Sequence, residues 1–146
     1  MSHITRIAAN AEQAIRNLDA LKSAAEMFAG ARWLENRADF TAYGNEARGI
    51  GNVKHVIGVE GKRYQIGVYE NAHLPGTYGL AFDSFSGELE PIFGKGLGKL
   101  MMEYHAEVVR ATADSMGHMY SRTELPDGSL RIETTVPAGA EALVYQ

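Results

Sequence analysis

A glycine-rich stretch with two lysines is the first place where this sequence could bind a ligand. Residues 94–99 read Gly-Lys-Gly-Leu-Gly-Lys and directly precede an apolar stripe typical of a helix. Glycines let backbone amides approach a phosphate, and a helix N-terminus adds positive potential. The spacing is not that of a Walker A loop, which ends in Gly-Lys-Ser/Thr. The stretch predicts a flexible connector, with an anion site built on Lys95 and Lys99 as the alternative.

Two other residues would extend such a ligand site. Asp83 follows three alternating apolar residues, and catalytic carboxylates are common where strands end. Aspartate is also a routine turn-former, which is the plainer interpretation. Arg48 stands in the glycine-rich stretch 44–52, which predicts either a ligand-facing loop or an ordinary one. No residue of this group can be assigned a catalytic role from its type and spacing.

Tyrosines on strands offer a different chemistry, the stacking of single-stranded bases. Tyr64 and Tyr78 alternate in phase with apolar residues, which places them in the core. Tyr69 and Tyr120 are out of phase with those residues and are the pair expected to be free. They are the candidate nucleic-acid contacts of this sequence.

Composition and charge exclude several classes of protein. The 146 residues include no cysteine, which excludes a disulfide framework, cysteine-ligated zinc and a thiol nucleophile. The five histidines show no ligand spacing, and no Gly-x-Ser-x-Gly motif occurs, so we expect no metal site and no cofactor. The net charge is −4 and the basic residues are scattered, which disfavours nucleic acid as the main partner.

The same composition predicts where the protein acts. No stretch approaches the roughly 18–20 apolar residues that span a membrane, and the first residues lack the apolar core of a signal peptide. We therefore expect a cytoplasmic protein without a membrane partner.

Hydrophobic periodicity predicts the helices and strands that position the candidate site residues. Asn10 and Gln13 resemble a capping box, and Gly30 is suited to end the helix that follows. The turn Pro126-Asp127-Gly128 separates two alternating runs, which is a strong hairpin signal. The expected strands are 3–8, 39–43, 53–59, 63–69, 78–83, 119–125 and 130–136, and the expected helices are 10–29 and 97–115.

This order predicts an α+β fold in which two helices pack on one face of a mostly antiparallel sheet of about five to seven strands. Residues 1–136 form a single domain, and residues 137–146 are an Ala-rich C-terminal tail. On the second helix, Glu103, Glu107, Arg110 and Asp114 share a stripe that we expect to face solvent.

Several short motifs, in this order and spacing, resemble a family of small uncharacterised proteins. They are residues 1–7, 15–22, 64–68, 76–78, Asp83, 104–108, Gly117 and 124–132. The family occurs in cyanobacteria, in red-algal plastids as a hypothetical chloroplast reading frame, in other bacteria and in phages. It is a domain of unknown function, so the resemblance supplies no catalytic residue. It implies a protein partner, since family genes neighbour those of AAA+ ATPases. This sequence departs from the family at 44–52 and 137–146.

The sequence thus favours a non-enzymatic accessory or interaction protein, bacterial or phage, that binds a protein partner, with an AAA+ ATPase system as the implied candidate. A homo-oligomer is compatible with it. The first alternative is a small-molecule or nucleotide-binding protein, or an enzyme, that uses the Gly94–Lys99 loop with Arg48 and Asp83. The second alternative is single-stranded nucleic-acid binding through Tyr69 and Tyr120.

Overall fold

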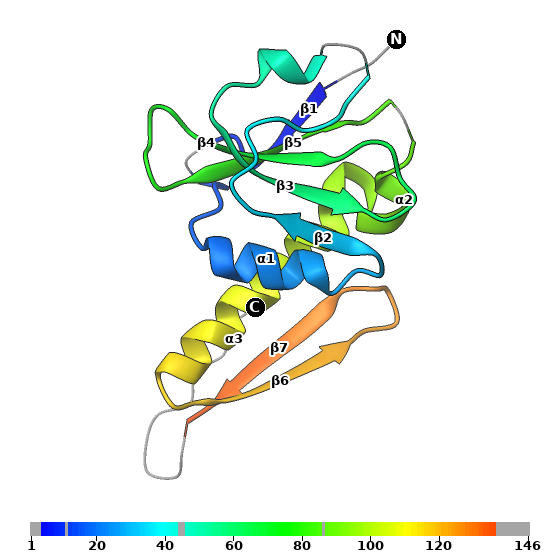
Figure 1. Ribbon diagram of the computed structural model, residues 1–146. Helices are drawn as coiled ribbons and strands as arrows, with labels where there is room; N and C mark the ends of the chain where they lie inside the picture. Colours follow the sequence, from blue (N-terminus) through cyan, green and yellow to red (C-terminus); the bar gives the residue numbers. More distant parts are fainter. Residues whose placement is uncertain (1–3, 11, 44–45, 86, 137–146) are drawn as a thin grey trace.

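The computed structural model describes residues 4–10, 12–43, 46–85 and 87–136 (Figure 1). The predicted tail 137–146, His3 and part of the stretch 44–52 lie outside the described residues. The elements in chain order are β1 (Ile4–Ile7), α1 (Leu18–Glu26), β2 (Ala31–Leu34), the 3₁₀ turn η1 (Glu46–Gly49), β3 (Val53–Val59), β4 (Ile66–Glu70), β5 (Tyr78–Asp83), α2 (Glu90–Phe93), the 3₁₀ turn η2 (Lys95–Leu97), α3 (Gly98–Ser115), β6 (Met119–Glu124) and β7 (Leu130–Thr135).

The strands form two separate antiparallel sheets. The larger has five strands in the order β1-β5-β4-β3-β2, and β6 and β7 pair only with each other among the described residues. The predicted α+β class is confirmed, with the difference that the last hairpin does not join the main sheet. Figure 1 shows the two long helices, α1 and α3, lying between the large sheet and the hairpin. No helix in the described residues is long and apolar enough to cross a membrane.

The first helix begins later than the capping signal at Asn10 predicts. Asn17 is the N-cap, and its side-chain Oδ1 accepts a hydrogen bond from the Ala20 amide at 3.0 Å. Asn10 instead closes a turn, in which its Oδ1 accepts from the Gln13 amide at 3.0 Å. Ile15 exchanges main-chain hydrogen bonds with Tyr78 at 2.9 and 2.7 Å, so its backbone belongs to the sheet and cannot be helical. Tertiary pairing has overridden a local capping signal.

The main core lies between the large sheet and its helices. It contains the apolar residues of β3, β4 and β5 that the period-two pattern assigns to one face, together with Leu21 of α1 and Leu100 and Tyr104 of α3. Tyr64 and Tyr78 pack against this core, as the pattern predicts. The helices therefore cover one face of the large sheet, in agreement with the predicted packing.

A second, smaller core covers the opposite face of the sheet. Phe40 and Ala42 pack there on Val53, Val56, Tyr69 and Ala81. The register of β3 against β4 shifts between Val53 and His55, which sends Val53 to this face rather than to the face of Ile57. Gly67 leaves the space that Phe40 fills, because a Cβ there would lie 2.5 Å from Phe40 Cδ1.

We expect Gly67→Ala to lower the free energy of unfolding by about 1–3 kcal/mol, because the buried Phe40 ring would have to shift away from the new Cβ. Urea denaturation measures the loss. Gly98→Ala is the matched control: it has no neighbour within 4 Å and a helical φ of −61°, so its stability should be unchanged or raised by about 0.4–1 kcal/mol. Equal effects of the two substitutions would contradict the packing described.

Candidate functional site

The Gly94–Lys99 loop already holds a carboxylate of its own chain. Glu90 Oε2 accepts a hydrogen bond from the Gly96 amide at 2.7 Å. The loop has positive φ at Gly94, Gly96 and Leu97, which is the backbone shape that presents amides to an anion. Lys95 and Lys99 are exposed on either side of it. An external anion would have to displace Glu90 from the Gly96 amide.

Asp83 lies at the end of β5, as predicted, and it organises the neighbouring main chain. Only 2% of the residue is exposed. Its Oδ2 accepts from the Tyr43 amide at 3.1 Å, and its Oδ1 accepts from the Phe85 amide at 3.0 Å. These bonds form a turn after β5 and hold the covering segment at Tyr43. The arrangement matches the turn-forming interpretation of this aspartate.

The structure does not gather the predicted ligand residues on one surface. Asp83 alternates with Phe82, which faces the helices, and so lies on the opposite face of the sheet. Lys95 and Lys99 come from η2 and α3 on the helix side. The backbone of Arg48 belongs to η1, and its side chain lies outside the described residues.

The two candidate tyrosines are also far from forming one stacking surface. Tyr69 is 3% exposed, with Arg6 stacked on its ring at 5.1 Å from the guanidinium carbon to the ring centroid. Its hydroxyl lies over Gly79, where a Cβ would come within 2.5 Å of it. Tyr120 is in the other sheet and is half-buried. The expectation that Tyr69 is free is wrong, because Gly79 opens a space on the neighbouring strand that its ring fills.

A cavity that the sequence analysis missed lies beside Tyr69. Its volume is about 590 Å³, and it is lined by residues from three separate segments. No carboxylate of the described residues lies within ion-pair distance of Arg6 at its wall. The wall residues are Arg6, Ala9, Gly51, Asn52, Tyr69, Glu70, Asn71, Ala72, His73 and Leu74.

Internal hydrogen bonds fix the polar wall of this cavity. Glu70 Oε2 accepts from the Gly76 amide at 3.0 Å, and Asn71 Nδ2 donates to Thr77 Oγ1 at 2.9 Å. The Tyr69 hydroxyl is buried and has no hydrogen-bond partner among the residues that the structure describes. The sequence carries no motif for this site, since its members come together through the pairing of β1 with β5, of β5 with β4, and of β4 with β3 and the segment before it.

The second feature of note is the charged interface between α3 and the hairpin formed by β6 and β7. Arg122 of β6 donates two hydrogen bonds to Glu103 of α3, both of 2.8 Å. Arg110 bridges Glu107 at 2.9 Å and Asp114 at 2.8 Å. The predicted solvent stripe is wrong for Glu103 and Glu107, whose side chains are only 14% and 12% exposed. The hairpin covers them.

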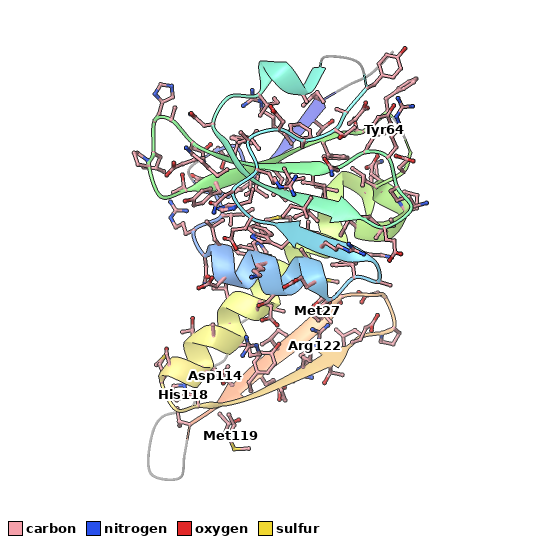
Figure 2. All side chains as sticks on the ribbon, in the orientation of Figure 1. Met27, Tyr64, Asp114, His118, Met119 and Arg122 are labelled. Carbon is pink, nitrogen blue, oxygen red and sulfur yellow. The ribbon has the colours of Figure 1, made fainter. Side chains whose placement is uncertain are left out.

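The hairpin has one packed face and one exposed face. The packed face consists of Tyr120 and Arg122 with Leu130, Ile132 and Thr134 opposite them. Burial raises the pKa of Tyr120, which is the effect expected of a phenol enclosed between strand and helix. Every residue of the other face is exposed: Met119, Ser121, Thr123, Arg131, Glu133 and Thr135. In Figure 2, His118 and Met119 lie at the end of the hairpin farthest from the five-stranded sheet.

The described residues contain no group of three or more His, Asp or Glu side chains that could hold a metal ion. Comparison with protein-family models, curated proteins and solved structures finds no match to this chain. The resemblance to the plastid reading-frame family stays a prediction.

We expect Glu103→Ala to loosen the hairpin from α3, because it removes both acceptors of the Arg122 guanidinium. The local opening free energy of β6 and β7 should fall by about 1–3 kcal/mol, read as faster amide hydrogen exchange in these strands. Asp114→Ala is the matched control on the same helix, since within the described part of the chain the Asp114 carboxylate bonds to Arg110 and to no residue of the hairpin. Unchanged exchange in Glu103→Ala would show that the ion pair does not hold the hairpin.

Proposed function

We propose that this chain is a non-enzymatic accessory protein that binds a protein partner through the β6–β7 hairpin. The observation that carries the proposal is a two-stranded sheet with one fully exposed face and no strand beyond it among the described residues. Among the described residues the outer edge of β6 has no paired strand, and the addition of a partner's strand is a common way of using such an edge.

The way the hairpin is held supports a docking role. Two isolated strands are marginally stable in water, so the hairpin depends on α3 for its shape. The bidentate Arg122–Glu103 pair and the bonded turn at Leu125–Ser129 fix it before any partner arrives. A rigid strand pair loses little conformational entropy on binding, which favours affinity.

The chemistry of the exposed face fits a protein surface better than a nucleic acid. Its charged residues, Arg131 and Glu133, pair with each other at 2.8 Å and leave no net charge there. Met119 is 71% exposed at one end and adds a flexible apolar contact. A phosphate backbone would need a basic surface, which this face lacks. The family resemblance adds an AAA+ ATPase as the candidate partner.

We expect a photo-crosslinking residue in place of Ser121, on the exposed face, to capture a specific protein from a lysate of the native host. The same residue in place of Lys62, exposed in the β3–β4 turn, is the control and should not capture it. Mass spectrometry of the adduct identifies the partner, and an AAA+ ATPase would support the implied candidate. Identical adducts from both positions, or none from Ser121, would refute hairpin docking.

A second candidate function is the binding of a small anion, such as a carboxylate, in the cavity beside Tyr69. The observation that favours it is Arg6 at the wall of a cavity of about 590 Å³, a cation that makes no ion pair with any residue of the described segments. The exposed His73 and Asn52 supply further polar groups at the same cavity. This site replaces the Gly94–Lys99 loop as the place where a small ligand would bind.

We expect millimolar acetate, citrate or phosphate to raise the melting temperature if the cavity binds anions. A ligand at about 100 times its Kd adds about 2.7 kcal/mol to the stability. Arg6→Gln should abolish the shift, whereas Arg37→Gln, exposed and outside the cavity, should leave it intact. A shift that survives Arg6→Gln would place the ligand elsewhere.

A further inference from the structure

We propose that His55 is a pH-sensitive switch at the start of residues 35–43, the strap that leaves β2 and crosses to the second core. Neutral His55 holds the Asn36 amide, and protonated His55 releases Asn36 and pairs with Glu35. The inference goes beyond the docking role of the hairpin and does not depend on it. In Figure 1 the strap is the cyan trace that leads from the end of β2 toward η1.

The strap belongs to no helix or strand, and side-chain acceptors fasten its main chain at three points. Between the first and the last of these points, Phe40 and Ala42 pack into the second core. Of the three acceptors, the first is a histidine, the second an amide and the third a carboxylate. The bonds run from the Asn36 amide to His55 Nδ1 at 3.1 Å, from the Thr41 amide to Gln65 Oε1 at 2.9 Å, and from the Tyr43 amide to Asp83 Oδ2 at 3.1 Å.

His55 can hold Asn36 only while its ring is neutral. A ring nitrogen that accepts a main-chain hydrogen bond carries no proton, so the proton of the neutral ring is on Nε2. Asn36 has a φ of +55°, a left-handed conformation that is uncommon for residues other than glycine. The bond to His55 therefore fastens a turn that an ordinary loop residue would leave. Protonation of Nδ1 turns the acceptor into a donor and breaks this bond.

The groups around His55 supply a partner for the protonated ring. Glu35 Oε1 lies 3.8 Å from Nδ1, so a small movement lets it accept the proton that Nδ1 then carries. The Trp33 ring lies against the imidazole, with centroids 5.1 Å apart, and an aromatic face attracts a cation. Lys22 is the opposing charge, but its Nζ lies 4.0 Å from Glu35 Oε2, the other oxygen of that carboxylate. Nδ1 thus has two alternative partners, the Asn36 amide and the Glu35 carboxylate.

The direction of the pH effect follows from these partners. Histidine changes its charge between about pH 5 and pH 8. The Asn36 bond belongs to the neutral ring, so the stability that it gives the strap is present at the upper end of this range and is lost as the pH falls. Gln65 does not titrate and continues to hold Thr41. Acid therefore opens the strap from Asn36 onward and removes the fastening on one side of Phe40, the residue that fills the space above Gly67.

A pH titration followed by two probes tests the switch. Trp33 is the single tryptophan of the sequence, and a protonated imidazole quenches a neighbouring indole. From about pH 7.5 to pH 5 we expect Trp33 emission to fall, and the protection of the Asn36 amide against hydrogen exchange to fall about fivefold, with one common midpoint. Amides of β4 and β5 should keep their protection, which distinguishes the switch from global unfolding. Constant protection at Asn36, or two different midpoints, would overturn the inference.

His55→Asn removes the titration and keeps an acceptor, because the asparagine Oδ1 takes the position of the imidazole Nδ1. We expect the protection of Asn36 in this variant to be equal at both ends of the pH range. His105→Asn replaces an exposed histidine of α3 and is the matched control, which should keep the wild-type pH dependence. A pH dependence that persists in His55→Asn assigns the titration to another group and refutes the switch.

Glu35→Gln provides a test that leaves the buried ring in place, since Glu35 is exposed. The substitution removes the negative charge that the protonated ring pairs with, so protonation becomes less favourable and the common midpoint should move to lower pH. Glu124→Gln, at an exposed position of β6 in the other sheet, is the control and should leave the midpoint unchanged. Equal midpoints in Glu35→Gln and the wild type would show that Glu35 is not the alternative partner.

Discussion

The structure depends on one helix that must pack against two different surfaces. α3 buries Leu100 and Tyr104 against the main core, and it presents Glu103 and Glu107 to the hairpin. Carboxylates in so covered a position need paired, hydrogen-bonded partners, because a buried charge left alone is costly. Arg122 and Arg110 supply them. The observed placement of the hairpin on α3 is therefore the one that gives the covered Glu103 carboxylate a partner, Arg122.

Much of this arrangement could be predicted from local sequence patterns. Period-two alternation placed Ile66 and Val68 on one face of β4 and Tyr69 on the other, and the two cores confirm that division. The Pro126-Asp127-Gly128 turn predicted the last hairpin correctly. These signals succeed because they involve neighbours along the chain, whose geometry is set by backbone sterics and turn chemistry.

The start of α1, the placement of the last hairpin and the cavity beside Tyr69 depend on contacts between segments that are far apart in the sequence. Nothing near Asn10 shows that Ile15 pairs with Tyr78 and delays α1 to Asn17. No local pattern tells whether a final hairpin extends a sheet or rests on a helix, so the sequence predicts that the stripe at Glu103 faces solvent, whereas the hairpin covers it. The cavity beside Tyr69 is hidden from local patterns for the same reason, since its wall combines residues of β1, of β4 and of the segment before β3, which the sheet brings together.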